Sequence, residues 1–295
     1  MKYKTSKEKS IEWGLSDRSI RNYCQNGRIK GAYLEGKIWM IPSKATKPER
    51  AKRSSSSPSL LDILKREKDN HIKGGIYHQI QVKMAYNSNH IEGSKLTEDE
   101  TRYIYETNTI GIDNKAINVD DIIETVNHFK CFDFIIDQAN KKLSESLIKE
   151  LHRILKCNTS VSRESWFKVG DYKLLENVVG GKETTPPSEV KSSMKELLSS
   201  YNKKEKHTLE DIVAFHVILE KIHPFQDGNG RVGRLIMFKE CLKNNIVPFI
   251  IYDSEKMFYY RGLKEYTRDK EYLLDTCRHS QDRMSKKIKA IKKIK

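Results

Sequence analysis

Residues 223–234 gather side chains that could act on a phosphate ester. The stretch is His-Pro-Phe-Gln-Asp-Gly-Asn-Gly-Arg-Val-Gly-Arg, and it joins one apolar helical segment to another. Gly228, Asn229 and Gly230 allow backbone angles that other residues resist, so successive N–H groups can point into one concavity at a helix N-terminus. A concavity of this kind binds anions, and a polyphosphate is the expected ligand.

The charged residues of this stretch also suit a polyphosphate ligand. Arg231 and Arg234 are three residues apart and share a helical face, and guanidinium groups match phosphate oxygens. Asp227 could anchor Mg²⁺ beside the phosphates, and His223 could take a proton near neutral pH. Each feature alone is usually structural. Their combination predicts attack by a hydroxyl on a metal-bound nucleotide.

The stretch resembles the signature of the Fic family, His-x-Phe-x-(Asp/Glu)-Gly-Asn-Gly-Arg-x-x-Arg, at every fixed position. The resemblance covers most of residues 58–280. It includes a Leu-Ser-x-x-Leu-Ile-x-x-Leu-His pattern that ends at His152 and the Tyr259-Tyr260 pair downstream. It implies a protein adenylyltransferase that uses ATP and Mg²⁺ to attach AMP to a Ser, Thr or Tyr hydroxyl of a protein substrate.

The resemblance also implies a role for each residue of the motif. His223 would deprotonate the target hydroxyl, Phe225 would anchor the loop in the core, and Asp227 would hold Mg²⁺. The residues expected to contact ATP are Gly228, Asn229, Gly230, Arg231, Arg234, Tyr259 and Tyr260. Thr267 stands where such families often carry an Asn, so the resemblance does not imply a contact between residue 267 and the nucleotide base.

Two further segments resemble accessory parts of Fic proteins. Ser88, Glu92 and Gly93 match an inhibitory motif, (Ser/Thr)-x-x-x-Glu-(Gly/Asn), at the end of a predicted helix around residues 80–93. The resemblance implies autoinhibition: Glu92 would pair with Arg234 in the γ-phosphate site and keep basal activity low. Spacing alone favours a plain surface carboxylate for Glu92.

The other accessory segment lies in the irregular region from Trp166 to Pro187, part of which could form a β-hairpin. It resembles a flap that pairs with an extended target segment. The flap residues are Val179, Gly180, Gly181 and Lys182. Lys173 stands where the family commonly has an Arg. The alternative for this region is an ordinary surface loop.

The first fifty residues predict a separate small domain. Residues 6–13 predict a helix, and Ser16 would cap a second helix with Ile20, Tyr23 and Cys24 on one face. Residues 28–34 and 37–42 predict two strands around a Glu-Gly turn. This segment resembles the excisionase/MerR-type winged helix-turn-helix domain.

That resemblance makes DNA a candidate partner of the small domain. The second helix would enter the major groove, and the wing would touch the DNA backbone. The candidate contacts are Asp17, Arg18, Arg21, Asn22, Lys30 and Lys37. The charge agrees, since residues 1–53 hold 14 Lys and Arg against 5 Asp and Glu, a net of +9 out of +15. A module that binds protein, or that only packs on the main domain, is the alternative.

Periodic apolar residues predict the helices that position the motif. We expect buried helical faces at residues 122–136, 147–155 with Ser144 as the cap, 209–222 and 231–242. The face predicted for residues 209–222, just before the motif, includes Ile212, Ile218 and Ile222. The tail, residues 286–295, predicts a basic helix or a frayed end.

The predicted fold is mainly α: a Fic-type helical bundle with a β-hairpin flap, preceded by the small winged domain. We expect residues 1–50 to form the winged domain, residues 51–58 a Ser-rich linker and residues 59–295 the Fic domain. The five cysteines predict reduced thiols. The chain shows no signal peptide and no apolar run long enough to span a membrane, which predicts a cytoplasmic protein without membrane contact.

Two alternative functions stay open. The chain could be a transcription regulator whose Fic-like domain only senses nucleotide, or a Fic enzyme that removes AMP or transfers another nucleotide. Members with this inhibitory motif are sometimes dimers, so a homodimer is one of the open oligomeric states.

Overall fold

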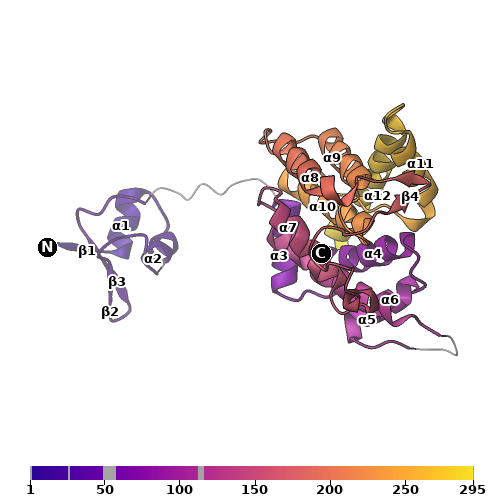
Figure 1. The fold of residues 1–295 in the computed structure, drawn as a ribbon. Helices are drawn as coiled ribbons and strands as arrows, with labels where there is room; N and C mark the ends of the chain where they lie inside the picture. The colour runs from indigo at the N-terminus through magenta and orange to yellow at the C-terminus, as the bar shows by residue number, and fades with distance from the viewer. Residues whose placement is uncertain (1, 26, 49–57, 112–115, 295) are drawn as a thin grey trace. The chain divides into compact units, whose positions relative to one another are not determined.

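A computed structural model of the chain describes residues 2–25, 27–48, 58–111 and 116–294. It divides into two compact units, residues 1–57 and 58–295 (Figure 1). The predicted linker, residues 51–58, lies outside the described residues except for Pro58.

The smaller unit combines two helices with a three-stranded sheet. Its elements in chain order are β1 (Tyr3–Thr5), α1 (Ser6–Trp13), α2 (Asp17–Gln25), β2 (Tyr33–Glu35) and β3 (Ile38–Pro42). The strands are antiparallel in the order β1-β3-β2. Both predicted helices and the hairpin are confirmed. The sequence did not predict β1, and residues 28–32 form turns because Gly27 and Gly31 adopt positive φ angles of 65° and 77°.

A small apolar core joins these elements. Ile20 and Cys24 of α2 are buried, as the predicted apolar face requires, and Tyr23 packs partly buried beside them. Ile29 and Ile41 complete the core. The opposite face of α2 is therefore left to solvent.

The larger unit is mainly helical. Its helices are α3 (Leu60–Asp69), α4 (Ile76–Ile91), α5 (Glu98–Thr107), α6 (Val119–Asp137), α7 (Glu145–Lys156), α8 (Pro187–Tyr201), α9 (Leu209–Ile222), α10 (Asn229–Lys243), α11 (Lys256–Glu265) and α12 (Glu271–Ile294). The four buried helical faces expected from the sequence lie on α6, α7, α9 and α10. The basic tail continues α12 as a helix. Among the described residues, none of the helices combines the length and apolar character needed to cross a bilayer.

Helix α10 lies at the centre of this bundle. It contacts α4, α6, α7 and α9, and most of its residues are buried (Figure 1). Helix α7 supports it with buried Leu147, Leu151 and Leu155, and the Ser144 side chain caps α7 by accepting the Leu147 N–H at 3.2 Å. The residues that begin α10 are therefore fixed on several sides.

A short hairpin precedes α8. Strands β4 (Val178–Val179) and β5 (Lys182–Glu183) pair antiparallel, and Gly180 and Gly181 form the turn between them with φ angles of 58° and 76°. Two consecutive positive φ angles are typical of the tight turns that match the twist of paired strands. The hairpin expected between residues 166 and 187 is confirmed.

One residue of the predicted α9 face does not fit. Ile218 was expected to be buried with Ile212 and Ile222, but its side chain is 45% exposed, whereas Ile222 is 5% exposed. The apolar stripe predicted on α9 was too wide, since only part of the helix surface can face α8, α10 and α12.

The two isoleucines make a matched pair for a stability test. Ile222→Ala should lower the free energy of unfolding by about 2–4 kcal/mol, because it leaves a cavity in the core. Ile218→Ala should lower it by less than about 1 kcal/mol, because its side chain already meets solvent. Urea denaturation measures both, and equal losses would contradict the assignment of the buried face.

Candidate active site

The motif loop between α9 and α10 is closed by one asparagine. The Asn229 side chain accepts the backbone N–H of Phe225 at 2.9 Å and donates to the carbonyl of the same residue at 2.8 Å. Phe225 is fully buried, as expected for an anchor. Asn229 thus holds the loop shut with its side chain, and only its backbone remains available to an anion.

His152 of α7 fixes the other side of the loop. Its ring stacks on Phe225 at 3.9 Å with an interplanar angle of 5°. Nδ1 accepts the N–H of Gly170 at 3.0 Å, so Nε2 carries the proton and donates to the carbonyl of Asp227 at 3.1 Å. Burial lowers the pKa of His152 to about 3. The ring therefore stays neutral and keeps both hydrogen bonds.

The predicted anion seat corresponds to the N-terminus of α10. Gly228 caps the helix with a φ of 84°, which favours glycine, and Gly230 lies in the first turn. A Cβ atom on Gly230 would stand 2.3 Å from Glu92 Oε1 and 2.9 Å from Arg234 Nη1. The carboxylate of Glu92 thus lies directly against the helix end, where the helix dipole favours an anion.

Arg234 is held by the end of α4. It is 3% exposed, and its Nε donates to Ser88 Oγ at 3.0 Å. Its Nη2 donates to the Ser88 carbonyl at 3.0 Å and to Glu92 Oε1 at 2.6 Å. Burial alone would lower the pKa of Arg234, but the charge and hydrogen bond of Glu92, together with Tyr259 and Glu220, outweigh it and raise the pKa. Gly93 follows with a φ of 104° and lets the chain leave the helix.

Arg231 faces a different set of partners. It donates to Glu124 of α6 and, at 3.4 Å, to Asp227 Oδ2. Lys156 of α7 donates to Glu124 as well and to Asp227 Oδ2 at 2.5 Å. The two motif arginines therefore point into separate charge clusters, although their spacing placed them on one helical face.

Asp227 is the carboxylate of this second cluster. Partial loss of solvation would raise the pKa of Asp227, but the charges of Arg231 and Lys156 and the hydrogen bonds from Lys156 and Gly228 outweigh it and lower the pKa to about 2. The group is ionised at neutral pH, and its side chain is 51% exposed. Among the described residues no group of three metal-ligating side chains exists. A cation held here would therefore take its other ligands from phosphate and water, which suits Mg²⁺.

His223 lies at the end of α9 in a left-handed conformation with φ 51°, and its N–H donates to the Leu219 carbonyl at 2.8 Å. The residue is half-buried. Burial and the nearby charge of Lys173 lower the pKa of His223. The imidazole is therefore mainly neutral at pH 7, which is the form that accepts a proton.

Lys173 ties the hairpin region to the motif loop. Its Nζ donates to Asn177 Oδ1 at 2.7 Å and to Thr184 Oγ1 at 2.6 Å, and its backbone N–H donates to the Pro224 carbonyl at 2.9 Å. Burial lowers the pKa of Lys173 to about 8. Val178 and Val179 on the first strand are exposed. The Lys182 side chain lies outside the described part of the structure.

The two tyrosines of α11 differ in their surroundings. Tyr259 is 1% exposed, and its hydroxyl is 2.6 Å from His216 Nε2. Tyr260 is half exposed, and its hydroxyl donates to the Ile91 carbonyl at 3.4 Å. Tyr259 is thus part of the wall behind Arg234, and only Tyr260 is open to a ligand. Thr267 accepts a hydrogen bond from Lys221 at 3.0 Å.

The comparison with known proteins identifies this loop and its supports. Residues 142–241 match the model of the Fic/DOC family. This part of the chain is therefore similar to Fic/DOC domains. The matched segment contains α7, the hairpin, α8, α9, the whole motif loop and most of α10.

Curated relatives extend the Fic/DOC match beyond the domain. The protein adenylyltransferase Fic of Drosophila grimshawi is 29% identical over 187 residues, which are 61% of this chain and 36% of the relative. The protein of the same name from Nematostella vectensis is 27% identical over 189 residues, 61% of this chain and 42% of the relative. The chain thus spans less than half the length of these relatives.

Solved structures show the same fold. A Fic domain containing signaling protein from Bacteroides thetaiotaomicron has a TM-score of 0.63 at 24% identity and covers 80% of this chain and 90% of that chain. Fic-1 from C. elegans has a TM-score of 0.63 at 20% identity and covers 80% of this chain and 72% of that chain. The predicted Fic-type helical bundle is confirmed.

Several residues of the candidate site were not found from the sequence. Lys156 and Glu124 hold Asp227 and Arg231, and His152 was noted only as the end of a pattern. Glu220 lies beside Arg234, and burial raises the pKa of its carboxyl to about 7. Lone charged residues on apolar helices were the only signal, and such residues usually face solvent.

The candidate DNA-binding residues belong to the smaller unit. Arg18, Arg21, Asn22 and Lys30 are all exposed. Arg21 also pairs with Asp17 at 2.6 Å within α2. These side chains are available to a partner, and their role stays a prediction.

The contact between Glu92 and Arg234 can be tested through stability. Glu92→Gln should lower the free energy of unfolding by about 1–3 kcal/mol, because a buried guanidinium loses its counter-charge while the Glu92 position remains partly exposed. Glu196→Gln on the exposed face of α8 is the matched control and should cost less than about 0.5 kcal/mol. Chemical denaturation of both variants measures this, and equal stabilities would contradict an energetic role for the contact.

Proposed function

We propose that this chain is a protein adenylyltransferase that transfers AMP from ATP to a Ser, Thr or Tyr hydroxyl of a protein and that Glu92 inhibits it. The proposal is supported by curated relatives that carry this activity in their names. Above all it is supported by one observation: a neutral imidazole at the end of α9 and an anion seat at the start of α10 lie on the same short, clamped loop.

The binding of ATP would use the start of α10. Backbone N–H groups at Gly228–Gly230 and the guanidinium groups of Arg231 and Arg234 would hold phosphate oxygens. Asp227 would hold Mg²⁺, which would neutralise phosphate charge. Lys156 contacts the same Asp227 oxygen, so its ammonium group has to shift when a cation binds. Tyr260 is exposed and could pack against the nucleoside.

The chemistry needs one proton acceptor and one leaving group. His223 would accept the proton of the target hydroxyl as the hydroxyl oxygen bonds to the α-phosphorus of ATP. The bond from that phosphorus to the bridging oxygen of the β-phosphate breaks, and pyrophosphate leaves. The product is a phosphodiester between AMP and the target. The lowered pKa of His223 keeps the imidazole in the accepting form down to mildly acidic pH.

The hairpin would place the target hydroxyl. Its exposed strand β4 can pair with an extended target segment through main-chain hydrogen bonds. Lys173 and Asn177 connect the hairpin to the carbonyl groups of the motif loop, since Asn177 Nδ2 donates to the Phe225 carbonyl at 3.3 Å. A target segment bound to the hairpin would thereby be held in register with His223.

Inhibition would follow from the position of Glu92. Its carboxylate takes the hydrogen bond of Arg234 and lies against Gly230, so the terminal phosphate of ATP competes with it for the same donors. Like charges cannot share this seat. ATP would bind weakly or in a pose that does not react until Glu92 moves away.

The transferase proposal predicts opposite effects of two variants. Glu92→Gly should raise incorporation of label from α-³²P-ATP into the protein itself at least tenfold, because it frees Arg234 for phosphate. His223→Ala in the same background should reduce labelling to background. Intact-mass spectrometry identifies the transferred group as AMP. No labelling of either protein with any nucleoside triphosphate would instead favour a nucleotide sensor.

We also infer that the smaller unit binds DNA. The exposed cations on α2 and near the wing support this inference, as does the excess of positive charge in residues 1–53. This unit would then let the chain act as a regulator of transcription as well as an enzyme.

Binding of duplex DNA tests the second function. Arg18→Ala and Arg21→Ala should each weaken binding about tenfold and reduce its salt dependence, because each removes a phosphate contact. Lys7→Ala on α1 is the control and should change little. Fluorescence anisotropy with duplexes from upstream of the coding sequence measures this. Equal effects of all three variants would contradict a specific role of α2.

A further inference from the structure

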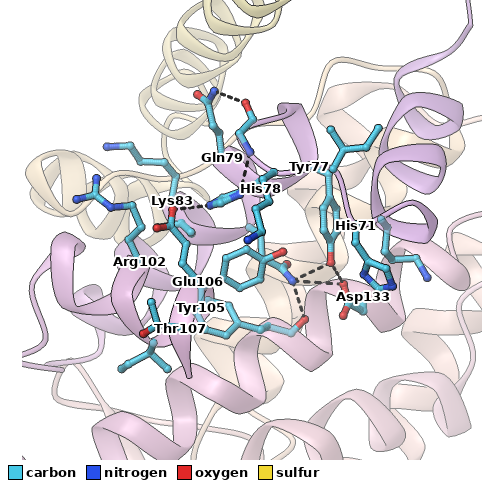
Figure 2. A pocket seen from close by; sticks show the side chains of 18 of the residues that line it. His71, Tyr77, His78, Gln79, Lys83, Arg102, Tyr105, Glu106, Thr107 and Asp133 are labelled. Carbon is cyan, nitrogen blue, oxygen red and sulfur yellow. Dashed lines mark hydrogen bonds and ion pairs between the residues drawn. The ribbon is translucent and has the colours of Figure 1, made fainter. Parts of the chain in front are cut away.

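A pocket of about 1000 Å³ lies against the first half of α4, at the opposite end of the helix from Glu92 (Figure 2). It is formed by the turn between α3 and α4 together with α5 and α6, and Lys287 of α12 lies at its edge. Its volume is at the upper end of the range for small-molecule sites. None of the motif residues of the Fic/DOC domain lines it.

The pocket has aromatic walls. Tyr105 of α5 meets Phe129 of α6 edge to face with ring centroids 4.9 Å apart, and His78 meets Tyr105 in the same way at 5.0 Å. Tyr77 closes the inner side, and Figure 2 shows its ring beside Asp133. Aromatic side chains arranged in this way suit a flat, partly apolar ring.

The inner end of the pocket offers hydrogen-bond acceptors. Gln81 Nε2 donates to Tyr77 Oη at 3.1 Å and to Asp133 Oδ1 at 3.3 Å, and Tyr77 Oη donates to the same carboxylate oxygen (Figure 2). Gln81 is 1% exposed, yet its Oε1 has no partner among the described residues. Within the described residues, Asp133 accepts hydrogen bonds only through Oδ1. Two neighbouring side chains therefore present acceptors that need donors.

The outer edge of the pocket is cationic. Lys83 and Arg102 line it in ion pairs with Glu98 and Asp99, and Glu106 lines it as well, whereas Lys68 lies near Asp133 at the inner end. Three further lysines line it without an ion pair among the described residues: Lys73, Lys130 and Lys287. Burial and the charge of Lys83 lower the pKa of Lys287. An anionic group at this edge would relieve that repulsion.

We propose that this pocket binds a guanine nucleotide. The base would lie between the aromatic walls and donate its N1–H and 2-amino hydrogens to Asp133 and Gln81. The phosphate would meet the lysines at the outer edge. Adenine fits less well, because its N1 is an acceptor and would face the carboxylate. This inference does not rest on the transferase activity, and it adds a ligand site separate from the anion seat.

The position of the pocket gives this ligand a route to the inhibitory contact. Tyr77 and Gln81 lie on α4, the same helix whose last turn holds Ser88 and whose cap is Glu92. A helix transmits a shift of its first turns to its end, because its backbone hydrogen bonds are continuous. Occupancy of the pocket can therefore bias how Glu92 meets Arg234.

Binding of nucleoside monophosphates to the full chain tests the site. Isothermal titration calorimetry without Mg²⁺ should show that GMP binds about tenfold more tightly than IMP, which lacks the 2-amino group, since one hydrogen bond to a carboxylate supplies that factor. The same preference should hold over AMP. Asp133→Asn should reduce the preference for GMP over IMP to less than about threefold.

Two variants keep the test decisive if Asp133→Asn fails to fold. Lys130→Glu at the exposed edge should weaken GMP binding about tenfold, whereas Lys195→Glu on α8 should leave it unchanged. Absence of saturable GMP binding up to about 1 mM would overturn the proposal. Equal weakening of GMP binding by Lys130→Glu and Lys195→Glu would overturn it as well.

Discussion

The larger unit is organised by the need of one buried cation, Arg234, for hydrogen-bond acceptors. The guanidinium comes from the central helix of the bundle and is nearly inaccessible to water, so it needs acceptors from elsewhere in the chain. The end of α4 supplies them through one hydroxyl, one carbonyl and one carboxylate. This requirement brings a helix from outside the matched family segment onto the motif and sets where an anion has to compete.

The parts of the site differ in how firmly they are held. The motif loop is clamped by Asn229 and His152, whose partners are backbone groups and whose side chains are buried. Glu92 is different, because its side chain is 30% exposed and follows the last turn of its helix. A rigid seat beside a replaceable carboxylate is the arrangement that allows binding to be controlled without rebuilding the loop.

Much of this arrangement was readable in the sequence, and the exceptions have physical reasons. The motif, the apolar faces of α6, α7 and α10 and the glycine turn of the hairpin depend on local spacing and were predicted. The divergence of Arg231 from Arg234 was not, because it depends on Glu124, which is distant in the chain. Lys156, a buried lysine on an apolar helix, gave no local signal. Ile218 was misplaced because periodicity shows a face without showing how much of it is covered.

Under the proposed function, Gly230 would serve two states of the molecule. In the present arrangement its missing side chain leaves room for the Glu92 carboxylate, and a phosphate group would require the same room. Any larger residue would therefore disturb the resting and the loaded forms together. A substitution at position 230 therefore cannot alter only one of the two forms. A substitution that affects the resting form alone would have to lie on α4.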